Sequence, residues 1–151
     1  MTDSPRVLVI DDDLTIRRVL SMALQDEGYV VDTAENGREA IRKSKSNFFN
    51  MALIDIRLPD MEGTRLLTEM KDTVPRMVKI IVTGHPGLQN AIDAVNLGAD
   101  AYVVKPFKME DLLRTVREQL QKQELAKKHC EEKIREFMEE RVIELERKGA
   151  I

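Results

Sequence analysis

The sequence has 151 residues, 42% of them hydrophobic and 34% charged, which is enough for one domain with a full-sized core and an additional segment. A formal net charge of −3 argues against nucleic acid binding driven by bulk charge. Cys130 is the only cysteine, and no apolar run reaches the length of a membrane span or of a signal peptide, so we expect a cytoplasmic protein without a disulfide.

Apolar runs and helical patterns alternate along the chain. Short continuous apolar runs are typical of strands buried on both faces, whereas apolar residues spaced three and four apart indicate helices. The predicted strands cover residues 6–10, 29–33, 51–55, 78–82 and 101–104. The predicted helices cover residues 14–27, 37–46, 64–72 with Thr64 as a candidate N-cap, 88–97 and 109–148. Five strand–helix pairs with short connections predict an α/β fold, a parallel sheet with helices on both faces.

Polar residues follow four of the five predicted strands. They are Asp11 and Asp12, Asp55, Thr83 and Lys105. Ligands of an open parallel sheet bind beyond the carboxyl ends of its strands, so these side chains are expected to meet there. Carboxylates brought together repel one another unless a cation intervenes, and an all-oxygen cluster favours Mg²⁺. A lysine and a threonine on the same rim can hold phosphoryl oxygens, which predicts phosphoryl transfer onto a carboxylate.

Each of these residues also has an ordinary structural explanation. Acids at a helix N-terminus are stabilising, so Asp11 to Asp13 can simply cap the first helix, and for Asp13 we expect only this role. Lys105 can be a solvated lysine before a turn, and Thr83 can satisfy a turn. Tyr102 can be a half-buried aromatic of an edge strand. We favour a shared site because it explains the polar residues at all four of these strand ends at once.

The motifs together resemble the receiver domain of two-component response regulators. They are Asp11-Asp12, Asp55 followed by Ile-Arg-Leu-Pro-Asp-Met-Glu-Gly, Thr83-Gly84 and Lys105-Pro106, over residues 5 to about 120. The resemblance implies a flavodoxin-like, doubly wound five-stranded parallel sheet of order 2-1-3-4-5, with helices on both faces and a long C-terminal helix. It places a receiver domain at residues 1–120 and a helical extension at residues 121–151.

The resemblance also implies a phosphorylation chemistry. Asp55 would be the phosphoacceptor and would attack a phosphohistidine on a sensor histidine kinase. Asp12, Asp55 and the backbone carbonyl of Arg57 would bind Mg²⁺ directly, and Asp11 would act mainly through water. Lys105 would neutralise the phosphoryl group, and its bond to Pro106 would be cis. The chain would be a signalling switch that assists its own phosphoryl transfer, and not an enzyme with a separate substrate.

Other positions of the resemblance concern switching and phosphoryl lifetime. Thr83 would hydrogen-bond the new phosphate, and Tyr102 would swing inward as Thr83 moves. Gly84 would leave space for the incoming group. Arg57 and His85 would flank the route of the hydrolytic water, and we expect their bulk to slow dephosphorylation. His85, His129 and Cys130 show no metal-ligand spacing.

The residues after 120 predict a long helix with balanced charge. Residues 121–151 contain eight Lys and Arg and eight Asp and Glu. An interrupted apolar stripe runs along Leu113, Val116, Leu120, Cys130, Ile134, Phe137, Met138, Val142 and Leu145. We expect a two-stranded coiled coil that makes a homodimer. The alternatives are a solvated or frayed helix, and a linker that leads to an output domain in a longer regulator.

Two other functions fit the sequence less well. An aspartyl-nucleophile phosphatase or phosphotransferase would carry a second Asp two residues after Asp55, where this chain has Arg57. A DNA-binding regulator would need a recognition motif, and the charge-neutral tail shows no helix-turn-helix with its turn glycine. We therefore expect no direct nucleic acid contact and no membrane contact. The output would pass to a downstream effector protein or to a missing output domain of a longer transcriptional regulator.

Overall fold

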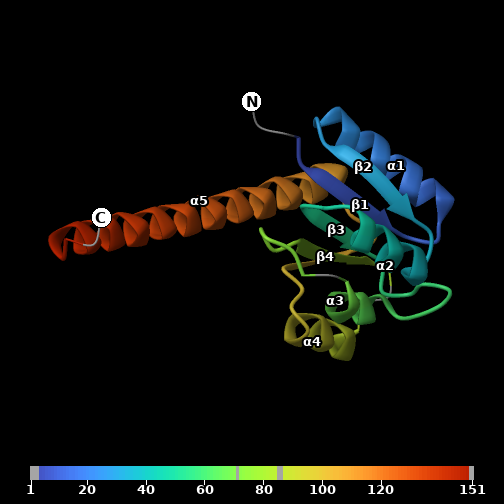
Figure 1. Cartoon of the computed structure of the whole chain (residues 1–151). Helices are drawn as coiled ribbons and strands as arrows, with labels where there is room; N and C mark the ends of the chain where they lie inside the picture. Colours follow the sequence, from blue (N-terminus) through green and yellow to red (C-terminus); the bar gives the residue numbers. More distant parts are fainter. Residues whose placement is uncertain (1–3, 71, 85–86, 150–151) are drawn as a thin grey trace.

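Strands and helices alternate from the N-terminus to the C-terminus of the chain (Figure 1). The computed structural model describes residues 4–70, 72–84 and 87–149. Its elements are β1 (Arg6–Ile10), α1 (Leu14–Asp26), β2 (Val30–Ala34), α2 (Gly37–Ser46), β3 (Met51–Ile54), the 3-10 helix η1 (Gly63–Arg65), α3 (Leu66–Glu69), β4 (Val78–Thr83), α4 (Leu88–Asn96), β5 (Ala101–Val104) and α5 (Met109–Arg147).

The strands form one parallel sheet in the order β2-β1-β3-β4-β5, which confirms the predicted topology. β1 pairs with β2 on one side and with β3 on the other, so that Val9 lies between Thr33 and Leu53. The chain order reverses at β1 and β3, which both lie inside the sheet. β2 is an edge strand, as expected from the lack of a polar residue comparable to Asp11 or Asp55 at its end.

Helices cover both faces of the sheet. Alternate residues of a strand point to opposite faces, and this divides the core into two clusters. One cluster joins Leu8, Ile10 and Ile54 to residues of α2, α3 and α4. The other joins Val7, Val9, Leu53 and Ile80 to Leu20 and Leu24 of α1 and to Leu112 and Val116 of α5. Burying the central strands on both faces explains why their sequences are continuous apolar runs.

The third helix differs from its prediction. A helix from residue 64 to 72 was expected with Thr64 as its N-cap, but η1 and α3 together end at Glu69, and Met70 has extended backbone. Thr64 lies inside η1 and is buried, and it therefore does not cap a helix. Leu66, Leu67 and Met70 bury their side chains in the core, which accounts for the helical spacing in the sequence.

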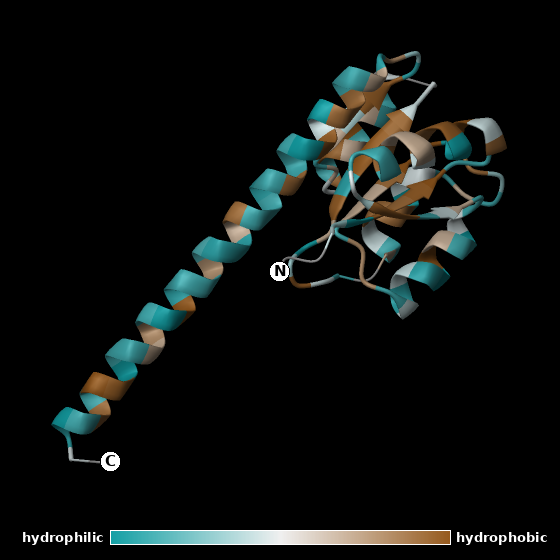
Figure 2. Cartoon of the chain, turned by 90° about the horizontal axis from the view of Figure 1, so that it is seen from above, coloured by the Kyte–Doolittle hydropathy of each residue, from teal (hydrophilic) through white to brown (hydrophobic). Residues whose placement is uncertain are grey.

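α5 is much longer than the domain needs. Its first part packs on the sheet, and the remainder extends away from the domain as a single straight helix (Figures 1 and 2). Gln123 anchors the helix where it leaves the domain, because its Nε2 donates hydrogen bonds to the carbonyl oxygens of Asn50 and Arg76 at 2.9 and 2.8 Å. No helix in the described part of the chain is both long and apolar enough to span a membrane.

Candidate functional site

The site residues are held at the carboxyl edge of the sheet by main-chain hydrogen bonds that continue the strand pairing. Asp11 N donates to Ala34 O at 3.1 Å, and Asp55 N donates to Ile10 O at 3.0 Å. On the other side of the site, Lys105 N donates to Thr83 O at 2.8 Å. These residues are therefore fixed by the sheet although most of them lie just outside its strands.

The three carboxylates predicted from the strand ends lie together. Asp11, Asp12 and Asp55 each offer an oxygen atom, and these atoms lie within 4.8 Å of one another. Asp11 and Asp55 are buried, whereas Asp12 is exposed. An all-oxygen set of this charge, open to solvent on one side, fits a hard divalent cation such as Mg²⁺ that retains several waters.

Lys105 reaches into the carboxylate cluster from the end of β5. Its Nζ lies 2.7 Å from Asp11 Oδ2 and 3.3 Å from Asp55 Oδ2. Burial alone would lower the pKa of Lys105, but the hydrogen bond and charge of Asp11, together with Asp55, raise it. The site therefore carries a fixed ammonium charge beside Asp55. The Lys105–Pro106 peptide bond is cis, as the resemblance implied.

Asp55 is the only carboxyl group among the described residues whose pKa is raised. Burial raises the pKa of Asp55 above its ordinary value, the charge of Lys105 lowers it, and the nearby Asp11 carboxylate raises it further. A carboxylate that is costly to keep charged is stabilised by any cation that binds beside it. A raised carboxyl pKa beside a charged partner at the edge of a parallel sheet is typical of a functional site.

The loop after β3 folds tightly against Asp55. Arg57 N donates to Asp55 Oδ1 at 3.3 Å, and Gly63 N donates to Ile56 O at 2.5 Å. A Cβ atom on Gly63 would lie 1.9 Å from the carbonyl oxygen of Asp55, so only glycine allows this approach. The loop thus fixes the Arg57 backbone near the carboxylates, while the Arg57 side chain is exposed.

Two residues that we did not predict hold the loops of the site in place. Asp60 accepts hydrogen bonds from Gly37 N and Arg38 N at 2.9 and 3.0 Å, which ties the β3–α3 loop to the start of α2. Arg17 Nη1 donates to the carbonyl oxygen of Asp11 at 2.7 Å. Asp60 is part of a Pro-Asp turn signal, and only the fold shows that it caps a distant helix.

Asp13 caps the first helix, as expected. Its carboxylate accepts hydrogen bonds from Thr15 N and Ile16 N at 2.8 and 3.2 Å and so caps α1. The side chain of Asp13 is thereby aimed at the helix and not at the cluster. The side chains of Asp11 and Asp12 thus lie in the carboxylate cluster, whereas that of Asp13 caps α1.

Thr83 and Tyr102 lie on the side of the site formed by β4 and β5. Thr83 is the last residue of β4 and is fully buried, and Tyr102 pairs with Ile81 in the sheet register. The Tyr102 ring packs on the core cluster under α2, α3 and α4, and its buried hydroxyl has no hydrogen-bond partner within the described residues. A Cβ on Gly84 would lie 3.8 Å from the Lys105 side chain. His85 lies outside the described residues.

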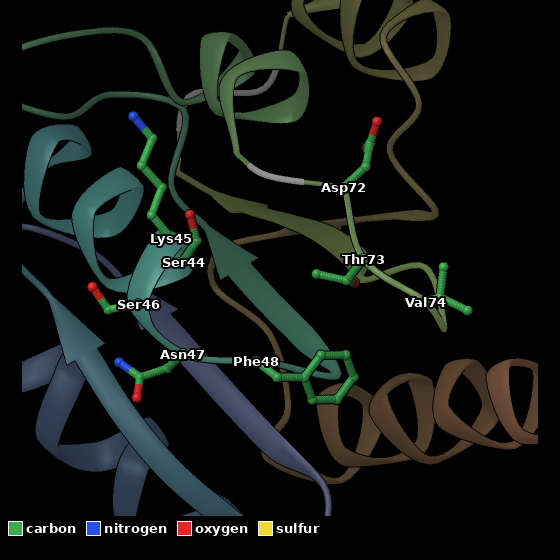
Figure 3. Close-up of a pocket in the computed structure, with 8 residues that line it drawn as sticks. All are labelled: Ser44, Lys45, Ser46, Asn47, Phe48, Asp72, Thr73 and Val74. Atoms are coloured by element: carbon green, nitrogen blue, oxygen red, sulfur yellow. The ribbon is translucent and has the colours of Figure 1, made fainter.

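A second hollow lies at the other end of the sheet. It has a volume of about 400 Å³ and lies between the end of α2 and the segment before β4 (Figure 3). Its lining residues are Ser44, Lys45, Ser46, Asn47, Phe48, Asp72, Thr73 and Val74. These residues precede strands β3 and β4, whereas the residues of the carboxylate cluster follow strands, so this hollow plays no part in the site.

The only group of three or more possible metal ligands within the described residues is Asp11, Asp12 and Asp55.

Comparisons with known proteins agree with this geometry. The sequence model described as the response regulator receiver domain matches residues 7–117. Regulatory protein AtoC of Escherichia coli (strain K12) is 35% identical over 127 residues, which cover 84% of this chain and 28% of that protein. The chain thus spans less than a third of the length of this curated relative.

Solved structures are similar in sequence and in fold. A response regulator receiver domain protein (CheY-like) from Methanospirillum hungatei JF-1 is 44% identical with a TM-score of 0.79, and the match covers 82% of this chain and 99% of that one. The response regulator TrrA from Thermotoga maritima, solved in complex with Mg²⁺-BeF, is 34% identical with a TM-score of 0.68. That match covers 76% of this chain and 98% of the other.

Proposed function

This chain belongs to the response regulator receiver domain family, and on that basis we propose that it takes a phosphoryl group from a sensor histidine kinase onto Asp55. An Asp55 carboxylate oxygen attacks the phosphorus atom, and the bond from phosphorus to the kinase histidine nitrogen breaks. The imidazole leaves with the electron pair of that bond, and an aspartyl-phosphate remains. Receiver domains are signalling domains, and we propose no separate substrate for this one.

The single observation that supports this proposal is the convergence of three carboxylates and one ammonium at the sheet edge. Asp12, Asp55 and the Arg57 carbonyl would hold Mg²⁺ directly and Asp11 through water, and the bound ion supplies charge neutralisation to the transferring phosphoryl group. Lys105 already contacts Asp55, so its ammonium lies where phosphoryl oxygens on that carboxylate need a donor. The structure of TrrA with Mg²⁺-BeF supports the choice of metal.

The labelling experiment uses acetyl phosphate with Mg²⁺ and intact mass. We expect one added phosphoryl group on the unaltered chain and none on Asp55→Asn. Asp13→Asn is the matched control, because Asn also caps helices and Asp13 lies outside the cluster; it should be labelled normally. Omitting Mg²⁺ should abolish labelling. A label that survives Asp55→Asn, or that resists both alkali and hydroxylamine, would show a different acceptor.

Thr83 and Tyr102 are proposed as the switch. Thr83 is the last residue of the buried strand β4 beside the site, and Tyr102 lies on the neighbouring strand with its ring packed on the core. A hydrogen bond from the Thr83 hydroxyl to the new phosphate would draw the end of β4 toward Asp55 and change the space available to Tyr102. We propose that this rearrangement alters partner binding or oligomeric state, which is the output of the chain.

Arg57 and His85 are proposed to lengthen the life of the aspartyl-phosphate. The exposed Arg57 side chain is two residues from Asp55, where bulk hinders the water that hydrolyses the acyl phosphate. Arg57→Asn should shorten the phosphoryl half-life, measured by loss of label after removal of acetyl phosphate. An unchanged half-life would remove Arg57 from this role.

The chain is proposed to consist of a receiver domain at residues 1–120 and a helical extension at residues 121–151 that makes a homodimer. The exposed apolar residues of α5 beyond the domain support this extension as an interface. Its output passes to an effector protein or to an output domain, because AtoC is much longer than this chain. We propose a cytoplasmic location and no direct nucleic acid contact. Sedimentation of the chain against one cut after Leu120 tests the dimer, and equal states of association would contradict it.

A further inference from the structure

An apolar groove lies where α5 leaves the domain. It has a volume of about 540 Å³ and lies between the helix and the segment that precedes β4. Val74, Pro75 and Val78 line one wall, and Ala126, Cys130 and Ile134 are among the residues of α5 that line the other. The Val74 side chain is 97% exposed, which is unusual for a valine beside an apolar groove.

The free part of α5 carries the same apolar face as its buried part. Eighteen residues of an α-helix make about five complete turns, so residues 18 apart share a face. Leu112 and Val116 pack on the sheet, and Cys130 and Ile134 lie on the same face five turns later. Further exposed apolar residues follow toward the C-terminus on a stripe that shifts around the helix: Phe137, Met138 and Val142. In Figure 2 the extended part of the helix shows brown segments among the teal ones.

The domain itself determines how a second helix can lie on this face. Up to about Gln123, the face of α5 that bears Leu112 and Val116 is covered by the sheet of its own domain. A parallel helix in register would have to place its residues 109–123 in that same space. An antiparallel helix meets no such obstacle, because the two domains then lie at opposite ends of the pair.

The charges of the free helix favour the antiparallel arrangement. Residues 121–135 have a net positive charge, from Lys122, Lys127, Lys128, Lys133 and Arg135 against Glu124, Glu131 and Glu132. Residues 136–149 have a net negative charge, from Arg141, Arg147 and Lys148 against Glu136, Glu139, Glu140, Glu144 and Glu146. A parallel pair places like halves together, whereas an antiparallel pair places each positive half beside a negative half.

We propose that two copies of this chain pair through antiparallel α5 helices, and that the groove of each copy receives the negative half of the other copy's helix. This proposal rests on the homodimer proposed above, and it adds the orientation of the two helices and the groove as a second contact surface. About 33 Å of helix lies beyond the domain from Ala126 to Arg147. With the positive and negative halves opposed, Cys130 of one copy lies beside Val142 of the other, and Val74 contacts the docked helix. The pairing covers the exposed apolar residues on this side of α5 in both chains, among them Ile134, Met138 and Val142.

Disulfide mapping tests the orientation in the full-length chain. Cys130 is the only cysteine, so Val142→Cys gives a protein with two defined thiols. Under mild oxidation we expect a disulfide between Cys130 of one copy and position 142 of the other, identified by peptide mass. In the unaltered chain the two Cys130 residues would be about 18 Å apart along the pair, too far to form a disulfide.

The other outcomes contradict the proposal. Disulfides between identical positions, 130 with 130 and 142 with 142, would show a parallel pair. A chain that sediments as a monomer and forms no intermolecular disulfide would overturn the pairing. Asp55 labelling is measured on the same samples, so a failure of the phosphoryl chemistry is seen separately from a failure of the pairing.

Charge substitutions at Val74 test the groove. Val74→Glu and Val74→Lys both replace the apolar side chain and introduce charges of opposite sign, and the exposed position makes either change compatible with folding. Because the docked helix half is negative, at low salt Val74→Glu should raise the dimer dissociation constant about fivefold more than Val74→Lys does. High salt should reduce the difference. Equal effects of the two variants at low salt would overturn the docking of the negative half in the groove.

Discussion

At the scale of single residues, the site depends on close approaches that allow one residue type. Gly63 is the clearest case, because its Cα faces the carbonyl of Asp55 with no room for a Cβ. Gly63 is not in the left-handed region, so the requirement is one of space and not of backbone conformation. The glycine therefore links the shape of the β3–α3 loop to the position of the proposed phosphoacceptor.

Gly63→Ala should displace this loop from Asp55. The added methyl would meet main-chain atoms, which cannot move aside as a flexible side chain can, so we expect a loss of roughly 2 kcal/mol in the free energy of unfolding. Labelling by acetyl phosphate should also slow. Gly87→Ala is the control, because its nearest contact would be the Asn90 side chain at 3.6 Å. Equal stability and labelling in both variants would contradict the close approach.

Ion pairing at Lys43 predicts a pH-dependent contribution to stability. Burial would raise the pKa values of Asp32 and Glu39 and lower that of Lys43. The main-chain hydrogen bonds that Asp32 and Glu39 accept, from Thr33 and Glu35, and the hydrogen bonds and charges that both share with Lys43 reverse each shift. The lowered carboxyl pKa values give stability above about pH 4 that is lost as pH falls through them. The raised lysine pKa gives stability that is lost above about pH 10.5.

Lys43→Met should therefore be less stable than the unaltered chain between about pH 5 and pH 10. The difference should be no more than about 1 kcal/mol, since the pair with Asp32 is partly exposed to solvent. Urea unfolding across this range measures it, and the difference should narrow at both ends. Lys45→Met, at a position for which the structure gives no ion pair, is the control. A pH-independent difference would mean that lost packing, and not the charges, causes it.

The sequence predicts single residues best where the fold forces them together. Asp11, Asp55, Thr83 and Lys105 were predicted to meet because each follows a strand of one parallel sheet, and the structure places them at one edge. Lys79 could not be predicted in this way. It is buried within β4, and its Nζ donates to Leu67 O of α3 at 2.9 Å, a contact that depends on the fold and not on a local pattern.

At the scale of elements, local spacing predicts the long helices and misjudges the short one. α1, α2 and α4 agree closely with their apolar spacing and with the caps at Asp13 and Asn36. The segment from 64 to 72 has the same spacing but gives only η1 and α3, because Met70 turns away in extended conformation after filling the core. Packing of a few leucines and methionines does not need a full helix.

The start of α2 is stabilised from outside its own segment. Asn36 caps the helix locally. Asp60, which lies in the β3–α3 loop, accepts two further hydrogen bonds from the main-chain N–H groups of Gly37 and Arg38. No pattern in the sequence predicts the second cap, since Asp60 is 23 residues from Gly37. These two hydrogen bonds couple the position of the β3–α3 loop, which carries Arg57, to the position of α2.

Removing the distant cap should cost stability. Asp60→Ala should lower the free energy of unfolding by about 1 kcal/mol, because two N–H groups at a helix start lose their acceptor. Asp60→Asn keeps one carbonyl oxygen and should lose less. Thermal or urea unfolding gives the comparison, with Glu62→Ala in the same loop as the control, since Glu62 makes no capping hydrogen bond. An Asp60→Ala protein as stable as the control would show that water replaces the cap.

At the scale of the whole molecule, α5 belongs to the domain only in part. Gln123 is the last residue of α5, within the described chain, that hydrogen-bonds to the domain, three residues beyond the boundary expected from the sequence. That boundary came from where the family resemblance ends. The contact depends on the turns before β3 and β4 reaching the helix, and such contacts are not visible in local sequence.

Two truncations should therefore differ in stability. A chain cut after Ala126 keeps the Gln123 hydrogen bonds and should unfold, at concentrations where the protein is monomeric, with the same free energy as the full chain within about 0.5 kcal/mol. A chain cut after Leu120 should lose about 1–2 kcal/mol, because the carbonyls of Asn50 and Arg76 lose their donor. Urea unfolding measures both, and equal losses would show that Gln123 contributes nothing.

The straightness of α5 has a mechanical consequence. Val116 is buried against the sheet, and Arg147 lies 31 residues further along the same uninterrupted helix, about 46 Å away. A rigid rod with one clamped end works as a lever, so a tilt of about 10° at its base sweeps the tip through about 8 Å. A small displacement of the domain at the base of α5 would thus become a large motion at any point near the tip of α5 where a partner binds.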